Sequence, residues 1–354
     1  MKSSDPHPIG PSFGEQIQRA SRWERRDFLK GIAAVAGSAG LLGYNLRPAA
    51  AEPPPETTRI RLVKTGLCVA PQYVAEDLLR TEGFTDIQYL PDTAKVGTSE
   101  HLATGAADLN MAFAAPLLIR VDAGEPVVLL GGVHVGCYEL FATERVHSIT
   151  DLRGKKVAVP GLGSSHHLYL SFIVAYVGLD PRKDINWVSA PPAEAKRLLA
   201  EGKVDAYLRF APDPQELRAN GVGHVLVNST LDRPWSQYFC CIVAGNREYV
   251  AKYPIATKRA LRAILKATDI CATEPGRVAR FLVDRGYAPS YEYALQTMRE
   301  VPYQKWRDYN PEDTVRFYAL RLQEVGMIKS DPKKLIAQGT DWRFLNELKK
   351  ELKA

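Results

Sequence analysis

Two stretches of the chain repeat one pattern of hydrophobic and polar positions. They cover residues 105–114 and 202–211, and Gly, Asp, Phe and Ala keep their places in both. A helical pattern precedes each copy, over 99–104 and 193–201, and a proline follows each copy. Each copy therefore predicts a helix, a tight glycine turn, a strand and a loop, and the duplication indicates two similar lobes.

Alternating strand and helix patterns continue along the chain and indicate an α/β protein. Strands are expected at 59–64, 87–90, 108–113 and 127–133 in the first lobe. In the second lobe they are expected at 155–160, at 185–188, in the second repeat copy, where the strand ends at Phe210, and at 225–227. Two extended segments, 137–143 and 237–243, are expected to cross between the lobes. The helical patterns after residue 254 predict no further sheet, so we expect these helices to wrap the first lobe.

The crossings divide the chain into lobe one, over 59–140 plus 241–354, and lobe two, over 141–240, with a hinge between them. Ligands of parallel α/β sheets gather at the carboxyl ends of the strands. Phe113 and Phe210 stand at such ends, one in each lobe. The sequence therefore predicts a ligand site between the lobes.

The first 51 residues have the order of parts of an export signal. Glu24-Arg-Arg-Asp-Phe-Leu-Lys30 resembles the twin-arginine signal Arg-Arg-x-Phe-Leu-Lys, although Glu24 replaces the usual Ser or Thr. A weakly apolar stretch (31–46) and three alanines (49–51) follow, as in a signal core and its cleavage site. We expect a signal peptide over 1–51, a spacer over 52–58, and a protein that works in the periplasm. A basic amphipathic helix on a membrane surface is the alternative.

The net charge argues against a nucleic-acid partner. The formal net charge is +6, and residues 1–51 contribute seven basic and four acidic residues to it. The chain without its signal is therefore only mildly basic. It also lacks a basic run interleaved with aromatic residues, which would favour nucleic acid.

The five cysteines, Cys68, Cys137, Cys240, Cys241 and Cys271, have no C-x-x-C spacing. Cys240 and Cys241 are neighbours on a predicted strand, so their side chains are expected to point to opposite faces. Cys137 and Cys240 lie on the two crossings, where a disulfide is possible in an oxidising compartment. The sequence leaves this pairing open.

Four short motifs occur in a familiar order: Ala70-Pro71 at the start of a helix, Asp151-Leu-Arg-Gly-Lys-Lys-Val-Ala-Val-Pro160, Gly163-Ser-Ser165, and Val204-Asp-Ala206. With them the chain resembles the periplasmic substrate-binding proteins of ABC importers. The similarity is to the branch that serves nitrate, taurine, aliphatic sulfonates and thiamine-pyrimidine precursors. It extends over residues 57–354 and is strongest over 149–212.

This resemblance implies an α/β, two-lobe periplasmic-binding-protein fold (Venus flytrap, type II) with two crossover segments and extra C-terminal helices. It implies a small-molecule ligand and, as partner, an ABC permease in the inner membrane. We expect a monomer that catalyses nothing and holds no cofactor and no metal. The motifs identify the family better than the solute, for which we expect a polar or anionic organic molecule with an apolar part.

The loop Gly161–Ser165 ends a predicted strand and opens a helix, so its backbone N–H groups and the helix dipole favour an anion. Ser164 and Ser165 can add hydrogen bonds to a ligand, although either can simply cap the helix. His166 follows in the first turn, where its charged form is disfavoured. We expect a neutral, ligand-binding imidazole there, with a solvent-facing histidine as the alternative.

Arg209 is a charged residue on an otherwise apolar strand end and needs a partner. It can bind a ligand carboxylate in bidentate fashion, or it can pair with Asp213. Phe113 and Phe210 can form apolar walls around a ligand, or they can pack in the core.

The remaining candidates come from the first lobe and from the crossings. Cys68 lies in a loop that is expected to face the loop Gly161–Ser165. It is either a ligand contact or an inert thiol. Gln72 can offer its amide to a polar ligand. The crossings are expected to line the back of the cleft, and they add His134, Tyr138 and Tyr238 to the predicted site.

Three alternatives to the importer interpretation stay open. Thiamine-pyrimidine synthases are similar in fold and carry the iron motif Cys-Cys-Cys-Phe-Cys, of which residues 239–243 keep two adjacent cysteines. The second alternative is a periplasmic protein that binds a metal or cofactor, because a site built from sulfur and imidazole ligands suits copper or zinc. Its candidate ligands are Cys68, His134, Cys137, His166 and Cys240. The third is a solute-sensing receptor domain, although no segment resembles a signalling module.

Overall fold

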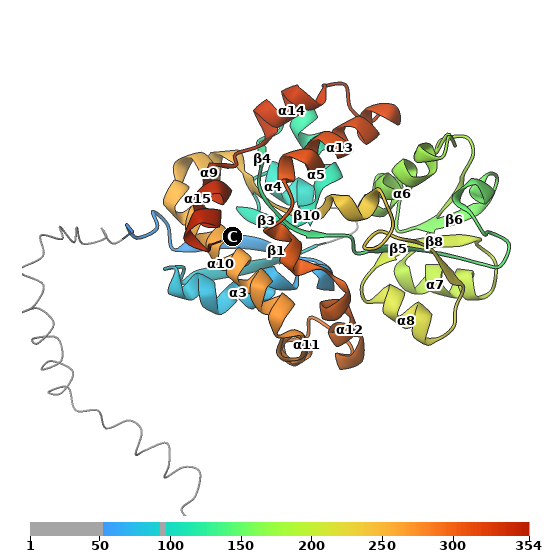
Figure 1. Ribbon diagram of the computed structural model, residues 1–354, viewed down its shortest axis with the longest axis horizontal. Helices are drawn as coiled ribbons and strands as arrows, with labels where there is room; N and C mark the ends of the chain where they lie inside the picture. Colours follow the sequence, from blue (N-terminus) through green and yellow to red (C-terminus); the bar gives the residue numbers. More distant parts are fainter. Residues whose placement is uncertain (1–51, 93–96, 354) are drawn as a thin grey trace, which may run out of the picture. The chain divides into compact units, whose positions relative to one another are not determined.

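The computed structural model describes residues 52–92 and 97–353, so the predicted export signal lies outside the described residues. The first-lobe strands form two sheets, in the orders β1-β2 and β3-β10-β4 (Figure 1). β1 and β2 are parallel, and β10 runs antiparallel to both of its neighbours. These strands are β1 (Arg59–Lys64), β2 (Asp86–Pro91), β3 (Leu109–Phe113), β4 (Val127–Val135) and β10 (Phe239–Asn246).

The second lobe contains one five-stranded sheet in the order β7-β6-β8-β5-β9. β6 is parallel to β7 and β8, while β5 is antiparallel to β8 and β9. The strands are β5 (Tyr138–Ala142), β6 (Lys156–Val159), β7 (Asn186–Ser189), β8 (Ala206–Phe210) and β9 (His224–Asn228), and the helices are α6 (Ser165–Tyr176), α7 (Pro192–Ala200) and α8 (Asp213–Ala219). The α/β class predicted from the sequence is confirmed.

The predicted lobe boundaries fall inside strands. Residue 140 lies within β5, which pairs along its length with β8 and β9 of the second lobe. Residue 240 lies within β10, which pairs with β3 and β4 of the first lobe. The chain therefore leaves the first lobe at Gly136–Cys137 and has returned to it by Phe239. An extended pattern predicts a strand but does not specify its partner, which is why both boundaries shift.

Helices of the first lobe surround its sheets. The C-terminal helices pack mainly there, as expected: α10 lies against α3, α13 and α14 against α5, and α15 against α10 and β4. These helices are α3 (Ala70–Thr81), α4 (Thr98–Ala103), α5 (Ala114–Asp122), α9 (Arg247–Lys252), α10 (Pro254–Thr273), α11 (Pro275–Asp284), α12 (Tyr291–Glu300), α13 (Pro311–Glu324), α14 (Pro332–Gly339) and α15 (Arg343–Glu351). Among the helices described, none is long and apolar enough to cross a membrane.

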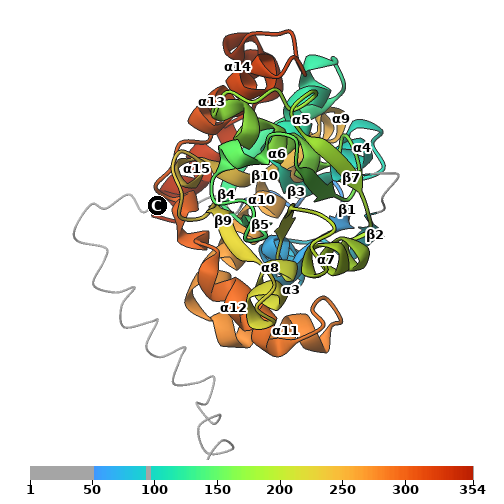
Figure 2. The ribbon, with the colours of Figure 1, turned by 90° about the vertical axis from the view of Figure 1, so that its right-hand side faces the viewer.

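One C-terminal helix also reaches the second lobe, which the sequence did not predict. α12 lies beside α8 in both views (Figure 1, Figure 2). Gln215 of α8 donates a hydrogen bond to Glu300 of α12 over 2.9 Å, and the guanidinium of Arg218 pairs with the same carboxylate over 2.7 Å. The C-terminal helices therefore link the lobes as well as covering the first one.

The two repeat copies have the same structural role, which confirms the duplication. Asp108 directly precedes β3, and its carboxylate accepts a hydrogen bond from the backbone N–H of Arg61 on β1 at 2.7 Å. Asp205 precedes β8, and its carboxylate accepts one from the backbone N–H of Lys156 on β6 at 2.9 Å. The backbone N–H of each aspartate donates in return to the carbonyl of the same partner. Each aspartate thus fixes the register of two neighbouring strands.

We predict that losing these aspartates destabilises the two lobes unequally. Asp108→Ala is expected to cost about 2 kcal/mol, because a buried carboxylate and its hydrogen bonds to the Arg61 backbone and guanidinium are lost. Asp205→Ala is expected to cost about 1 kcal/mol, because its partner Arg145 is largely exposed. Urea unfolding measures both, with the exposed Asp308→Ala as control, which should change stability by less than about 0.5 kcal/mol. Equal effects of Asp108→Ala and the control would contradict the assigned role.

Two amide side chains replace backbone pairing between β1 and β3. The backbone N–H of Val63 donates to Oδ1 of Asn110 at 2.7 Å. The buried carboxamide of Gln72 joins the same strands: Nε2 donates to the carbonyl of Val63, and Oε1 accepts from the backbone N–H of Met111, both at 2.8 Å. In the second lobe the corresponding strands, β6 and β8, pair directly through their backbones.

Candidate functional site

Four of the predicted ligand residues meet where the repeat strands end. Phe113 at the end of β3 and Phe210 at the end of β8 both pack against the ring of Tyr138, with ring centroids 5.6 and 5.7 Å away. His166, in the first turn of α6, stacks on Phe210 at 4.9 Å and contacts Tyr138 at 5.4 Å. We call these four residues the aromatic layer. It combines one side chain from the first lobe with three from the second.

The imidazole of His166 has a lowered pKa and a defined tautomer. Burial lowers its pKa well below the ordinary value, and the nearby charge of Arg209 lowers it further. Nη1 of Arg209 donates a hydrogen bond to Nε2 of His166 at 2.9 Å, so the ring proton is on Nδ1. Nδ1 lies 3.4 Å from the hydroxyl of Ser165. The lowered pKa agrees with the neutral imidazole expected from the sequence, and its main physical cause is burial.

Arg209 lies at the edge of the aromatic layer and is paired within the chain. Its Nε donates to Asp213 at 2.9 Å, which is the internal partner considered from the sequence. Asp213 also accepts a hydrogen bond from Tyr207 and lies 3.4 Å from the ammonium of Lys196. Within the described part of the chain, Nη2 of Arg209 has no partner. The Nη2 edge of this guanidinium can therefore still donate hydrogen bonds to an anion.

Ser164, in the loop Gly161–Ser165, caps α6. The hydroxyl of Ser164 accepts a hydrogen bond from the backbone N–H of His167 at 3.3 Å, which is N-capping. Ser165 is the first residue of α6, beside His166, and its hydroxyl lies next to the aromatic layer. Ser164 thus has the capping role weighed as the alternative, whereas the hydroxyl of Ser165 lies beside the imidazole of His166.

The two lobes touch at the aromatic layer. Gly66, in the loop after β1, lies directly against the ring of Phe210. A Cβ atom added to Gly66 would lie 2.4 Å from Cε2 of that ring, so no side chain larger than a hydrogen atom fits at this position. Surface hollows elsewhere lie along α12 and between α13 and α15, and none of the predicted ligand residues lines them. In this conformation the lobes are closed against each other, and the side chains of the aromatic layer fill the predicted ligand site.

Two tyrosines complete the layer and were missed from the sequence. Tyr169 stacks on Tyr138 at 4.8 Å and meets the edge of Phe113 at 5.4 Å. Tyr318, on α13, meets Phe113 at 5.2 Å. Tyr169 is one helical turn after Ser165, so helical periodicity would have placed it on the same face. No local pattern indicates Tyr318, which reaches the layer from a distant C-terminal helix.

The other predicted residues are placed elsewhere. Cys68 and His134 join three cysteines in a separate buried cluster, which is described below. The amide of Gln72 is fully engaged by the backbones of β1 and β3. Tyr238 stacks on Phe317 at 3.9 Å, on α13. The structure thus brings Phe113, Tyr138, Ser165, His166, Arg209 and Phe210 together and separates the rest from them.

The expectation that Cys240 and Cys241 point to opposite faces is wrong. Their sulfur atoms and that of Cys137 lie within 4.8 Å of one another. The register of β10 against β4 shifts on both sides of Cys241, and such a bulge turns successive side chains toward one space. All five cysteines are free in the structure, although the sulfur atoms of Cys137 and Cys240 are 3.3 Å apart.

Comparisons with known proteins identify relatives of this chain. The model of the NMT1-like family matches residues 67–281, which is more than half of the chain. The nitrate/nitrite binding protein NrtA of Nostoc sp. is 22% identical over 270 residues, which are 68% of this chain and 60% of that protein. The chain spans from 21% to 60% of the length of three curated relatives of this kind.

Solved structures share the fold. The periplasmic nitrate-binding protein NrtA from Synechocystis superimposes with a TM-score of 0.72 at 17% identity, covering 85% of this chain and 90% of that one. The alkanesulfonate-binding protein SsuA from Xanthomonas axonopodis pv. citri gives a TM-score of 0.63 at 20% identity, covering 83% and 100%. The two-lobe periplasmic-binding-protein fold predicted from the sequence is thereby confirmed.

Proposed function

Because the chain belongs to the NMT1-like family, we propose that it is the periplasmic solute-binding component of an ABC importer. In this proposal residues 1–51 direct export by the twin-arginine route, and the mature protein delivers its solute to an inner-membrane permease without catalysing a reaction. The relatives named for nitrate or alkanesulfonate binding support this role. The observation that carries it is the aromatic layer, in which both repeat copies bring their strand ends, Phe113 and Phe210, against Tyr138.

The chemistry of the layer favours a small anion with an apolar part. Nη2 of Arg209 supplies a positive donor, and the hydroxyl of Ser165 supplies a second polar contact. The rings of Phe113 and Phe210 would cover an apolar group of about the size of a short alkyl chain. A bare inorganic anion would leave these rings without a contact, so organic sulfonates and carboxylates are the preferred solutes.

Binding requires the lobes to open, because side chains fill the site in the closed conformation. Gly66 and Phe210 must separate before a solute can reach Arg209. A solute that contacts both lobes then stabilises a closed complex, and only its preference for that state drives closure. The permease would recognise the closed, loaded form.

We predict that a double substitution abolishes anion binding. A bound solute raises the melting temperature of the mature protein, because it stabilises the folded state alone. Ser165→Ala combined with Arg209→Ala is expected to remove this increase for sulfonates and carboxylates. The fold should persist, because Asp213 keeps Tyr207 and Lys196 as partners. Thermal unfolding against a panel of nitrate, sulfonates, carboxylates, amines and pyrimidines measures the effect.

Arg153→Ala is the matched control. Arg153 belongs to the same lobe and also pairs with an aspartate, Asp184, but it is largely exposed. This variant should keep the full increase in melting temperature. If the double variant responded to the solute as the control does, our placement of the charged end would be wrong. If no anion raised the melting temperature of the unaltered protein, the proposed solute class would be overturned.

A further inference from the structure

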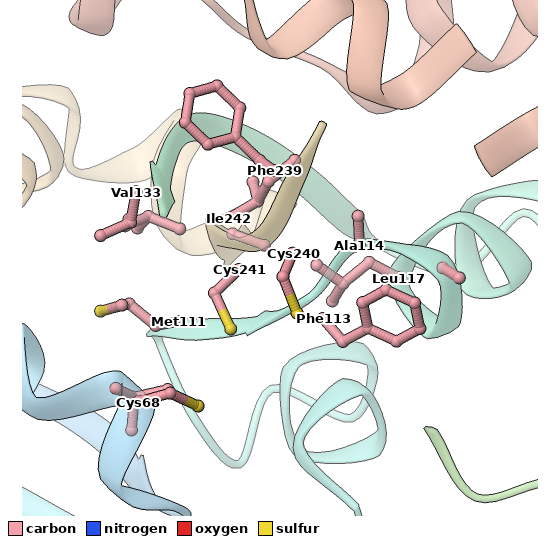
Figure 3. Close-up of a cluster of buried hydrophobic side chains, with 14 of the residues drawn as sticks. Cys68, Met111, Phe113, Ala114, Leu117, Val133, Phe239, Cys240, Cys241 and Ile242 are labelled. Atoms are coloured by element: carbon pink, nitrogen blue, oxygen red, sulfur yellow. The ribbon is translucent and has the colours of Figure 1, made fainter. Parts of the chain in front are cut away.

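Five soft ligand side chains from distant segments converge behind the aromatic layer. They come from the 3-10 turn η2 (Leu67–Val69), the end of β4, the crossing after it, and β10. Figure 3 shows the sulfur atoms of Cys68, Cys240 and Cys241 turned toward a common space. We call this set the thiol cluster, and its members are Cys68, His134, Cys137, Cys240 and Cys241.

The thiol cluster contains two overlapping triads. The sulfur atoms of Cys68 and Cys241 and one ring nitrogen of His134 lie within 4.8 Å of one another, and so do the sulfur atoms of Cys137, Cys240 and Cys241. Cys241 belongs to both triads. With metal–sulfur bonds of about 2.3 Å, the ligand atoms of a tetrahedral site lie roughly 3.8 Å apart, so small side-chain movements suffice to bind an ion.

His134 is oriented like a metal-binding histidine. Its Nδ1 donates a hydrogen bond to the carbonyl of Val135 at 3.3 Å, which leaves Nε2 as the free nitrogen. Nε2 is buried and, within the described part of the chain, has no hydrogen-bond partner. Buried polar atoms are rarely left unsatisfied, and ligating histidines usually donate their second nitrogen to a carbonyl or carboxylate. The ring of Tyr303, with its centroid 5.5 Å away, helps to hold this orientation.

We propose that the thiol cluster is a binding site for a soft, thiophilic metal ion, and that Cu(I) is the ion it fits best. Sulfur and imidazole are the ligands that soft metals prefer, and the cluster contains no carboxylate for a hard cation. Cu(I) bound by one deprotonated thiol and one neutral imidazole forms an uncharged unit. Zn(II) with three thiolates would leave a net negative charge in an apolar interior, which is costly.

The site has a route for loading. Cys137 is only partly buried and lies where the chain crosses from the first lobe to the second. Opening of the lobes at the crossing would expose it first. The inference depends on the geometry of the cluster and not on the solute-binding role, because none of the five side chains belongs to the aromatic layer.

The test is a Cu(I) titration of the reduced, full-length mature protein without oxygen, in competition with the chelator bathocuproine disulfonate. About one Cu(I) per chain is expected to transfer from the chelator. Cys241→Ser removes the sulfur shared by both triads and is expected to weaken binding by at least about 100-fold. Cys271→Ser is the matched control, because Cys271 is a buried free thiol on α10 outside the cluster. The Cys271→Ser variant should bind Cu(I) as tightly as the unaltered protein.

Several outcomes would overturn the proposal. They are no transfer of Cu(I), equal binding by Cys241→Ser and the unaltered protein, or a Cys137–Cys240 disulfide in protein isolated from the periplasm. Binding of Zn(II) alone, lost in Cys241→Ser, would support the site and overturn the choice of Cu(I). If Cys241→Ser does not fold, the partly exposed Cys137→Ser serves instead. The solute-induced rise in melting temperature is measured in the same cysteine variant. A normal rise would show that solute binding is intact, so that failure of the metal proposal can be distinguished from failure of the importer proposal.

Discussion

Replacing Gly66 with alanine is expected to hold the lobes apart and to weaken solute binding by roughly 100-fold. The backbone of Gly66 has φ −78° and ψ −178°, which an alanine adopts without strain. The added Cβ atom would lie 2.4 Å from Cε2 of Phe210, and that ring cannot move freely because it stacks on His166. The clash therefore affects the closed state alone. Overpacking of this kind costs about 3 kcal/mol, and apparent affinity falls with the population of the closed state.

Isothermal calorimetry measures the affinity, and small-angle X-ray scattering measures the opening. Gly97→Ala is the matched control, because it adds the same methyl group in the first lobe, at an exposed glycine with φ −82° and ψ 168° and with no atom within 4 Å. This variant should bind and close like the unaltered protein. Unchanged affinity and unchanged scattering in Gly66→Ala would contradict closure at this contact.

A double-mutant cycle locates the effect. Phe210→Leu replaces the ring that meets the new methyl group with a smaller side chain. Gly66→Ala should therefore cost much less affinity in that background. A pair in direct contact gives such a non-additive result, whereas separate sites add. Additive effects would mean that Gly66 acts through another neighbour, and the closed arrangement would then be revised.

The repeat made much of the fold predictable from the sequence. Gly, Asp and Phe at fixed places specify a turn, a register-fixing carboxylate and a strand end, and the structure uses them alike in both copies. Asp108 and Asp205 bind the backbones of β1 and β6 in the same manner. For the same reason Phe113 and Phe210 were placed correctly at the strand ends, although their contact with Tyr138 depends on how the lobes pack.

What could not be predicted depends on contacts between distant segments. Tyr318 reaches the aromatic layer from α13, and no periodicity near Phe113 indicates this. Tyr238 was expected at the cleft, but it stacks on Phe317, which also lies on α13. Cys241 joins Cys240 on one side of β10 only because the register against β4 shifts, and register is a property of the pair of strands.

Removing the amide of Gln72 is expected to give the largest loss of stability. Gln72→Ala would leave the carbonyl of Val63 and the N–H of Met111 buried without partners and would create a cavity beside them. Each unsatisfied group costs about 1–3 kcal/mol, so a total loss of about 4 kcal/mol is expected in urea unfolding. Gln88→Ala is the control on the exposed side of β2, where the amide contacts only Asp86, and it should change stability by less than about 0.5 kcal/mol.

Hydrogen exchange distinguishes this role from simple packing. Gln72→Met keeps most of the side-chain volume but cannot accept from Met111, so the exchange of that amide should accelerate in both Gln72 variants. The amides of β8 should be unaffected, because β6 and β8 pair through their own backbones. Slow exchange of the Met111 amide in Gln72→Met would contradict the bridging role. It would mean that β1 and β3 hold their register through Asp108 and Asn110 alone, with Gln72 left to fill space.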